Sequence, residues 1–291
     1  MKMNYSFGLR PEKRKDILKD FVLLGPLTKG VPIEDRLSVR NMMTPVRTQW
    51  DGSCAGEAMG AGVDEFLQKR DYKKTILLSV RWVYTLARDR GGYPEGATLS
   101  DVCWVAYTLG IPEEKYFPDV KGDNTSKPIP VIDGETVEDN ALKYRIKSYA
   151  KIPDLDRLLI AMNDPLVRVV LIGINVYKGM VESPCTETGI VPDPTCFQRP
   201  QGGHAMTADA YDLKAQIPQY KKPGWIEAKN SWGTKYGDAG YNKFSLAYFK
   251  NIISAYVCTD IPKEELEKKT VKVADISILD IKKDRLWIPK V

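Results

Sequence analysis

Histidine is almost absent from this sequence, whose 291 residues include a single one, His204. Imidazole is the side chain that ordinarily exchanges a proton near neutral pH, so any such chemistry in this protein depends on His204. The scarcity also argues against the His-rich sites that commonly bind zinc. No two of the five cysteines form a CxxC pair, which argues against a structural zinc site as well. We therefore expect no metal and no other cofactor.

Long apolar runs and a strong charge excess are also missing. No run approaches the roughly 20 apolar residues that a membrane span needs. The run at 21–27 is short, contains a proline and follows a charged stretch, so we expect no signal peptide and, given the few cysteines, an intracellular protein. The net charge of +5 is spread along the chain. This mild positive charge is all that favours a nucleic-acid partner, so we expect neither nucleic acid nor membrane as a partner.

What is present is an ordinary globular composition, with 43% hydrophobic and 28% charged residues. Apolar residues recur at helical spacing in the first half of the chain, over 53–69, 79–90 and 99–109. Short strand-like pieces bounded by Gly, Pro and Asp follow in the second half, at 166–174, 205–211, 224–229 and 240–246. This segregation predicts an α+β fold with two lobes.

We divide the chain into four parts on this basis. Residues 1–40 form an N-terminal extension or short pro-segment, and their charged stretch from Gly8 to Asp16 is typical of a solvated lead-in. A mainly helical lobe follows over 41–150, a mainly β lobe over 151–260, and a C-terminal extension over 261–291. The N-terminal part could equally be a short cleavable blocker or a permanent strap across the β lobe.

One cysteine stands at the start of a predicted helix, where the segment 48–55 reads Thr-Gln-Trp-Asp-Gly-Ser-Cys-Ala. With Ser53 as the N-cap, Cys54 lies in the first turn, and the helix dipole and unpaired N–H groups there favour a thiolate. The backbone N–H of Cys54 could also donate to a developing oxyanion. Taken alone, the segment fits a buried core thiol better than a nucleophile.

Two further segments carry groups that could assist such a thiol. His204 follows two glycines and opens a strand of small residues, and Asn230 ends a predicted strand before a turn rich in Trp and Gly. The oxygen of an Asn side chain can accept a hydrogen bond from an imidazole N–H and fix its tautomer. A structural histidine and a non-catalytic turn remain the alternatives.

Taken together, these segments resemble the papain family of cysteine proteases over about residues 35–258. The most specific match reads Asn-Ser-Trp-Gly-Thr at 230–234 and continues as Gly-Asp-Ala-Gly-Tyr at 237–241. Gly-His-Ala at 203–205 and Pro-Val-Arg-Thr-Gln at 45–49 are similar too. The order of Cys, His and Asn also follows the spacing of that family. The resemblance implies a two-lobed fold, with the cysteine on a helical lobe and the His and Asn on an antiparallel, β-barrel-like lobe.

The resemblance also implies the roles of the site residues. Cys54 would be the nucleophile, His204 its base and later acid, and Asn230 the residue that orients the imidazole. Gln49 would help to hold the oxyanion. Trp232, which would shield the His–Asn pair, would line the substrate cleft together with Gly203 and Ser53. The expected activity is that of a thiol endopeptidase acting on a peptide or protein.

The sequence departs from the family pattern around the nucleophile. Asp51 and Ala55 stand where the family usually has Cys and Trp, and the interval from Gln49 to Cys54 is one residue shorter, so that a local bulge would have to deliver the amide. Glu57 lies one turn after Cys54, where its carboxylate could disfavour the thiolate or point into solvent.

The remaining cysteines leave choices open. Cys185 and Cys196 could form a disulfide or stay as two free thiols, whereas Cys103 and Cys258 are expected to be core thiols.

Two functions other than that of an endopeptidase also fit the segments above. The first is an acyltransferase, transglutaminase or amidase, although those folds commonly carry Asp in place of Asn230. The second is a non-catalytic papain-like module that binds peptides.

Overall fold

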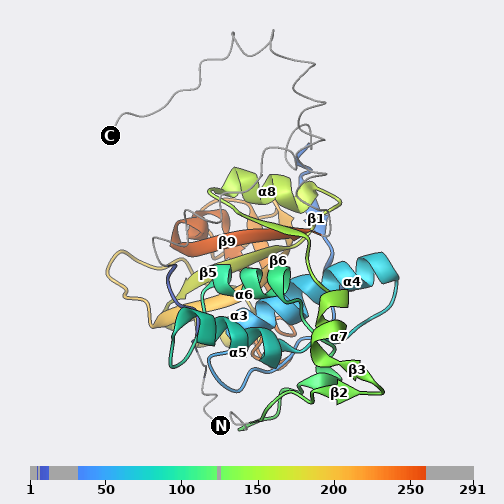
Figure 1. Ribbon diagram of the computed structural model, residues 1–291. Coiled ribbons are helices and arrows are strands. Elements are labelled where there is room, and N and C mark those ends of the chain that lie inside the picture. The colour runs from blue at the N-terminus through green and yellow to red at the C-terminus, as the bar shows by residue number, and fades with distance from the viewer. Residues whose placement is uncertain (1–4, 6, 13–31, 123–125, 260–291) are drawn as a thin grey trace, which may run out of the picture.

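The computed structural model describes residues 5, 7–12, 32–122 and 126–259. Its centre is an antiparallel sheet with the strand order β4-β9-β5-β6-β7-β8, in which β1 pairs with β6 (Figure 1). The strands are β1 (Arg36–Ser38), β4 (Ser148–Lys151), β5 (Val170–Val176), β6 (Gly202–Asp212), β7 (Trp225–Lys229), β8 (Tyr241–Ser245) and β9 (Ile252–Thr259). A separate hairpin consists of β2 (Val131–Ile132) and β3 (Glu135–Thr136). The predicted strands in the second half are thus confirmed, with ends shifted by a few residues.

Helices cover both faces of the sheet. Those of the first half gather on one face, and α8 lies on the other (Figure 1). The helices are α3 (Cys54–Glu57), α4 (Glu65–Tyr72), α5 (Val80–Gly91), α6 (Leu99–Thr108), α7 (Val137–Lys143), α8 (Leu155–Asn163) and α9 (Cys185–Thr188). A π-helical stretch, η2 (Ala58–Asp64), joins α3 to α4, and short 3₁₀ turns are η1 (Arg40–Met42), η3 (Glu114–Tyr116), η4 (Lys178–Met180) and η5 (Leu246–Asn251). No helix among the described residues is long and apolar enough to cross a bilayer.

The helix ends follow from local chemistry. The hydroxyl of Ser79 accepts from the backbone N–H of Trp82 and starts α5, and Thr98 caps α6 in the same way through Asp101. The helix predicted over 53–69 continues to residue 72, with the π-helical stretch inside it. Ser53 occupies the N-cap position, as predicted, but its side chain makes no capping bond.

Two apolar cores lie on the two faces of the sheet, and β5 contributes to both. Leu171 packs with the helices of the first half, while Val170 and Ile172 pack against α8. Successive strand residues point to opposite faces, so a strand covered on both sides must be apolar throughout. This explains the unbroken apolar run, and it confirms the expected α+β fold with a helical lobe and an antiparallel sheet lobe. The predicted C-terminal extension lies outside the described residues.

Candidate active site

Cys54 is the first residue of α3, and α3 lies against β6. Its thiol is fully buried, with the backbone of Ala205 on β6 and of Gly8 and Leu9 from the N-terminal segment within hydrogen-bonding range. Burial raises the pKa of the Cys54 thiol to about 11, and these backbone groups oppose the rise only in part. The lower thiol pKa expected from the helix start is therefore not found in this conformation, because removal of water outweighs the dipole.

His204 on β6 and Asn230 at the end of β7 lie side by side. His204 Nε2 and Asn230 Oδ1 are 2.8 Å apart, and the ring of Trp232 stacks on the imidazole with centroids 4.4 Å apart and planes inclined by 28°. Asn230 Nδ2 donates to Asn242 Oδ1, and the backbone N–H of Ser231 donates to Asn230 Oδ1. The orientation of the Asn230 amide is thus determined from both of its ends.

This arrangement assigns the imidazole tautomer. Asn230 Oδ1 can only accept, so His204 Nε2 carries the hydrogen and Nδ1 has the free lone pair. Nδ1 is buried and has no hydrogen-bond partner among the described residues. Burial lowers the pKa of His204 to about 4, with the Asn230 bond opposing the shift, so the ring is neutral. Cys54 approaches the backbone of Ala205, the next residue along β6, but no hydrogen bond among the described residues joins its thiol to His204 Nδ1.

Gln49 lies beside Ser231, the residue after Asn230, and Ser53 directly precedes Cys54. Ser231 Oγ donates to Gln49 Oε1 at 2.6 Å, and Gln49 Nε2 donates to the carbonyl of Asp51 at 2.8 Å. The backbone N–H of Gln49 donates to the Ser231 carbonyl, which ties the loop before Cys54 to the residue after Asn230. Ser53 is buried beside Cys54, and its hydroxyl has no partner in the described part of the chain.

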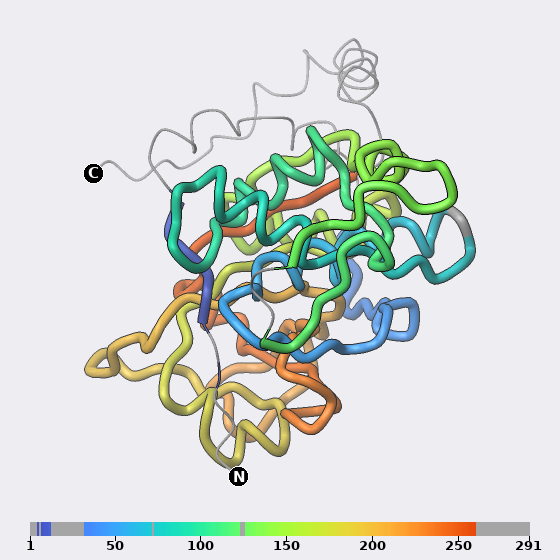
Figure 2. The backbone as a smooth tube through the Cα atoms, turned by 60° about the horizontal axis from the view of Figure 1, so that its bottom comes forward, coloured from blue at the N-terminus to red at the C-terminus, as the bar shows by residue number. Residues whose placement is uncertain are grey.

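The N-terminal residues 5 and 7–12, which we call the strap, run across the cysteine. The Leu9 N–H donates to the Gly203 carbonyl, the Arg10 N–H donates to the Ala97 carbonyl, and the Ala97 N–H donates to the Gly8 carbonyl, at 3.0–3.1 Å. In Figure 2 the dark-blue strap runs past the teal loop that joins α5 to α6. The strap therefore pairs with both lobes at once, and Gly203 is one of its partners.

Strap side chains fill the space between the lobes. Leu9 is 5% exposed and lies so close to Gly173 that a Cβ there would be 2.5 Å from its methyl group. A Cβ on Gly8 would collide with the carbonyl oxygen of Gly52, so only glycine fits over the loop that precedes Cys54. Glu12 accepts from the backbone N–H and the hydroxyl of Ser100 at the start of α6.

The prediction of a solvated lead-in is thus wrong for these residues. The physical reason is that both cleft edges present unpaired backbone groups, and a strand that pairs with them also buries an apolar side chain. An isolated Leu9 next to Gly8 within a charged stretch was the available sequence signal.

Glu57 does not point into solvent, which corrects one of the two alternatives left by the sequence. Its carboxylate oxygens are buried without a partner among the described residues. They border a cavity of about 10 Å³ between η2 and the sheet, whose lining includes Arg47, Thr207 and Lys229. Burial raises the pKa of Glu57 to about 8, and Arg47 opposes this rise.

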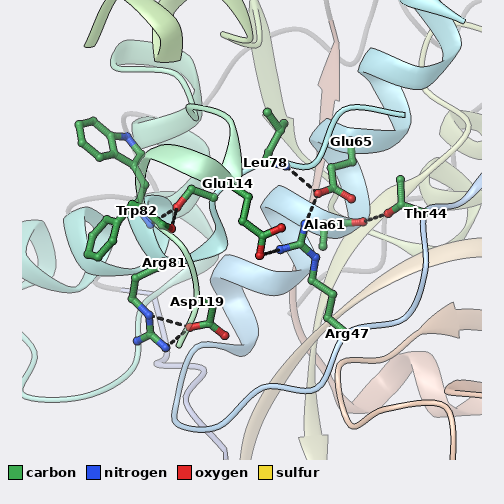
Figure 3. A network of polar contacts seen from close by, with 11 residues as sticks. Thr44, Arg47, Ala61, Glu65, Leu78, Arg81, Trp82, Glu114 and Asp119 are labelled. Carbon is green, nitrogen blue, oxygen red and sulfur yellow. Dashed lines mark hydrogen bonds and ion pairs between the residues drawn. The ribbon is translucent and has the colours of Figure 1, made fainter. Parts of the chain in front are cut away.

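Other buried charges surround this cavity and were missed by sequence reasoning. Figure 3 shows the Arg47 guanidinium between the carboxylates of Glu65 and Glu114. Lys229 Nζ donates to Thr44 Oγ1 and to the Ala61 carbonyl, and burial lowers the pKa of Lys229 to about 8. Charged residues interrupting apolar helix and strand patterns were the only sequence signal for this cluster.

The remaining cysteines are all free thiols. Cys185 is buried with its sulfur 3.7 Å from the hydroxyl of Tyr236, whereas Cys196 is exposed, so the free-thiol alternative holds for this pair. Cys103 and Cys258 are buried, as expected for core thiols. Within the described ranges, no three His, Cys, Asp or Glu side chains are grouped so as to hold a metal ion.

Comparison with known proteins agrees with this geometry. The sequence model of the papain family cysteine proteases matches residues 34–258. Among solved structures, the fold is similar to xylellain, a cysteine protease from Xylella fastidiosa, with a TM-score of 0.68 and 21% identity over 88% of this chain and 96% of that one. It is also similar to procathepsin B S9 from Trypanosoma congolense, with a TM-score of 0.63 and 10% identity over 87% and 86% of the two chains.

A further similar structure is the digestive procathepsin L 3 of Tenebrio molitor, with a TM-score of 0.60 and 15% identity over 80% of this chain and 72% of that one. At these identities the structural matches establish the fold, whereas the family model covers most of the chain in sequence. The chain therefore belongs to the papain family of cysteine proteases.

Proposed function

We propose that this protein is a cysteine endopeptidase that cleaves peptide bonds with Cys54 as nucleophile, His204 as proton carrier and Asn230 as the residue that orients the imidazole. One observation carries the proposal. The 2.8 Å contact between His204 Nε2 and Asn230 Oδ1 leaves the buried Nδ1 as the available base, and Cys54, at a helix start, lies against the backbone of Ala205, the residue after His204. Membership in a protease family makes a peptide or protein the expected substrate.

The chemistry follows from these positions. His204 Nδ1 takes the thiol proton of Cys54, and the thiolate attacks the scissile carbonyl. The backbone N–H of Cys54 and the second amide hydrogen of Gln49 hold the oxyanion. His204 then protonates the departing amine, which leaves an acyl-enzyme, and afterwards removes a proton from the water that hydrolyses it. Trp232, stacked on the imidazole, keeps water from the His204–Asn230 bond.

In the conformation described, the strap blocks this chemistry. It covers Cys54 and excludes water from the thiol, so the thiolate–imidazolium pair forms only after the strap leaves.

The strap also crosses the cleft with its chain direction opposite to that of a substrate. The departing amine must lie on the side of His204 and Trp232, so the substrate runs from Ala97 toward Trp232. Tyr5 and Phe7 of the strap lie on Trp232, whereas Arg10 pairs with Ala97.

The strap also supports internal cleavage rather than removal of end residues. It enters the cleft on the Trp232 side, passes over Cys54 and leaves along Ser100. A chain that continues in both directions therefore fits the cleft, as an endopeptidase requires. The strap also shows that a peptide can be held there without reaction, and this observation favours a peptide-binding module as the second candidate.

The test uses the full chain with Leu9→Asp, which places a charge in the apolar pocket and should release the strap. We expect a peptidyl epoxysuccinate to add once to this protein and much more slowly to wild type, as measured by intact mass. Cys54→Ala should abolish the adduct, His204→Ala should slow it strongly, and Cys196→Ala, which removes the exposed thiol, should leave it unchanged. Thermal melts confirm folding.

Cleavage of internal peptide bonds by the same protein, followed by mass spectrometry of the products, completes the test. Labelling of Cys54 without any peptide cleavage would contradict the peptidase and favour acyl transfer to another acceptor. If the folded Leu9→Asp protein were neither labelled nor able to cleave peptides, the peptidase would be contradicted. The non-catalytic peptide-binding module would then be the remaining candidate function.

A further inference from the structure

Two buried thiols that take no part in the proposed reaction meet where α6 packs on β9. Cys103 Sγ on α6 and Cys258 Sγ on β9 are 4.0 Å apart. The two residues are 155 positions apart in the chain, and their side chains are 0% and 1% exposed. α6 belongs to the helical lobe and β9 to the sheet lobe (Figure 1). A bond between the two sulfurs would therefore join the lobes covalently.

The geometry requires only a small movement for such a bond. The sulfurs of a disulfide are about 2.05 Å apart, so these two atoms would approach each other by about 2 Å in total. Rotation of the two side chains about their Cα–Cβ bonds shifts the sulfurs by this much without moving the backbone. Both side chains belong to the same apolar core, and a disulfide, which carries no charge, suits such surroundings.

The pair lies close to the pocket that holds Leu9 of the strap. Leu99 precedes the α6 cysteine by four residues, and Ser254 precedes the β9 cysteine by four. Both approach Gly173 from the side on which Leu9 lies, since a Cβ there would meet all three side chains. α6 and β9 thus form two walls of the Leu9 pocket. A bond between them would fix the separation of those walls.

We propose that Cys103 and Cys258 form a disulfide that locks the two lobes together under oxidising conditions, with hydrogen peroxide as the oxidant. One sulfur attacks a peroxide oxygen and the O–O bond breaks, which gives a sulfenic acid and one water. The second sulfur attacks the sulfenic sulfur, the S–S bond forms and a second water leaves. Two thiols are oxidised, one peroxide is reduced, and the thiol protons end on the two waters. The lock does not depend on the peptidase function.

The lock should stabilise the fold because it closes a long loop. A cross-link restricts the unfolded chain, and the effect increases with the number of residues between the cysteines, which is large here. Typical gains from a disulfide correspond to a rise of about 4 to 16 °C in Tm for a domain of this size. Because both sulfurs are buried, the oxidant reaches them through local opening. The edge strand β4, which pairs Tyr149 with Cys258, is only four residues long and can open in this way.

The experiment treats the folded full chain with hydrogen peroxide at the dose that fully oxidises the exposed thiol of Cys196. Remaining thiols are alkylated after denaturation, and mass spectrometry of the tryptic peptides shows how each cysteine ended. We expect a cross-link between the peptides of Cys103 and Cys258 that dithiothreitol removes. Circular dichroism melts of the same samples should show the rise in Tm, and dithiothreitol should reverse it.

Two variants under the same treatment assign the effect. Cys103→Ala should abolish both the cross-link and the rise in Tm. Cys185→Ala is the matched control and should leave both unchanged, because this buried thiol lies in the other core beside Tyr236. Recovery of Cys103 and Cys258 as alkylated thiols in the treated wild type would overturn the proposal, whether or not the variants fold. A cross-link without any rise in Tm would show that the bond forms but does not lock the lobes.

Discussion

Glu57 lies one helical turn beyond Cys54, and its environment decides its charge. The carboxyl borders the small cavity together with Arg47 and Lys229, and Glu65 and Asp119 add negative charge around it. Removal of water is the largest effect, so the pKa rises although two cations are near. The neutral form of Glu57 is the one that the folded protein prefers.

Glu57→Gln should therefore stabilise the fold at neutral pH. The pKa rises from 4.5 to about 8, so the protonated carboxyl contributes stability that is fully present below pH 4.5 and is lost as pH rises through about 8. At pH 7 the folded protein has lost on the order of 3 kcal/mol of this stabilisation. A Gln side chain stays neutral, so the variant does not lose it. Urea unfolding should show a small difference at pH 4.5 and a more stable variant at pH 8. The exposed Glu138→Gln is the control, and an equal difference at both pH values would mean that the folded protein compensates the carboxylate.

At the scale of elements, the strap is held by backbone pairing, one apolar side chain and a close approach. Leu9 N–H and Arg10 N–H find acceptors on opposite lobes, and Gly8 lies against the loop that precedes Cys54. Sequence patterns could not reveal this, because a strap of seven described residues has neither helical nor strand periodicity. Its partners, Ala97 and Gly203, are more than a hundred residues apart in the chain.

Gly8→Ala should loosen the strap. Its Cβ would collide with the carbonyl of Gly52, and overpacking of this kind costs about 1–3 kcal/mol, or about 5- to 150-fold in the population of the closed strap. The measurement is the rate of Cys54 alkylation by iodoacetamide in the full chain, which should rise by that factor. Pro11→Ala, at an exposed strap position, should leave the rate unchanged. A Gly8→Ala rate equal to that of wild type would show that the strap moves aside without leaving the thiol.

For the whole molecule, the candidate active site depends on the contact of η2 with the sheet. Thr207 Oγ1 on β6 donates to the Ala58 carbonyl, and Lys229 on β7 reaches across to Ala61. Ala58 lies one helical turn after Cys54, and Lys229 directly precedes Asn230. These bonds hold Cys54 of one lobe in register with His204 and Asn230 of the other.

Gly62→Ala should weaken this contact for the entire fold. The added Cβ would collide with Thr207 Oγ1, and we expect the free energy of unfolding to fall by about 1–3 kcal/mol. Gly60→Ala is the matched control, since its Cβ would lie 3.2 Å from a methyl of Val80 on the same lobe. There the helix preference for Ala should offset the contact. Urea unfolding followed by circular dichroism measures both, and equal stabilities of the two variants would contradict the expected weakening.

The sequence by itself determined what local chemistry can specify. Apolar spacing placed the helical stretch from Cys54, α5, α6 and β5 to β8 within a few residues, although it did not predict α7, α8, β4 or β9. The motifs around Cys54, His204 and Asn230 identified the family, since those motifs are contiguous. Only the tertiary structure decided the burial of Glu57, the path of Gly8 and Leu9, and the contact of Cys103 with Cys258. Each of these depends on groups brought together from distant parts of the chain. Charge, exposure and pKa are properties of such surroundings, and a linear pattern does not contain them.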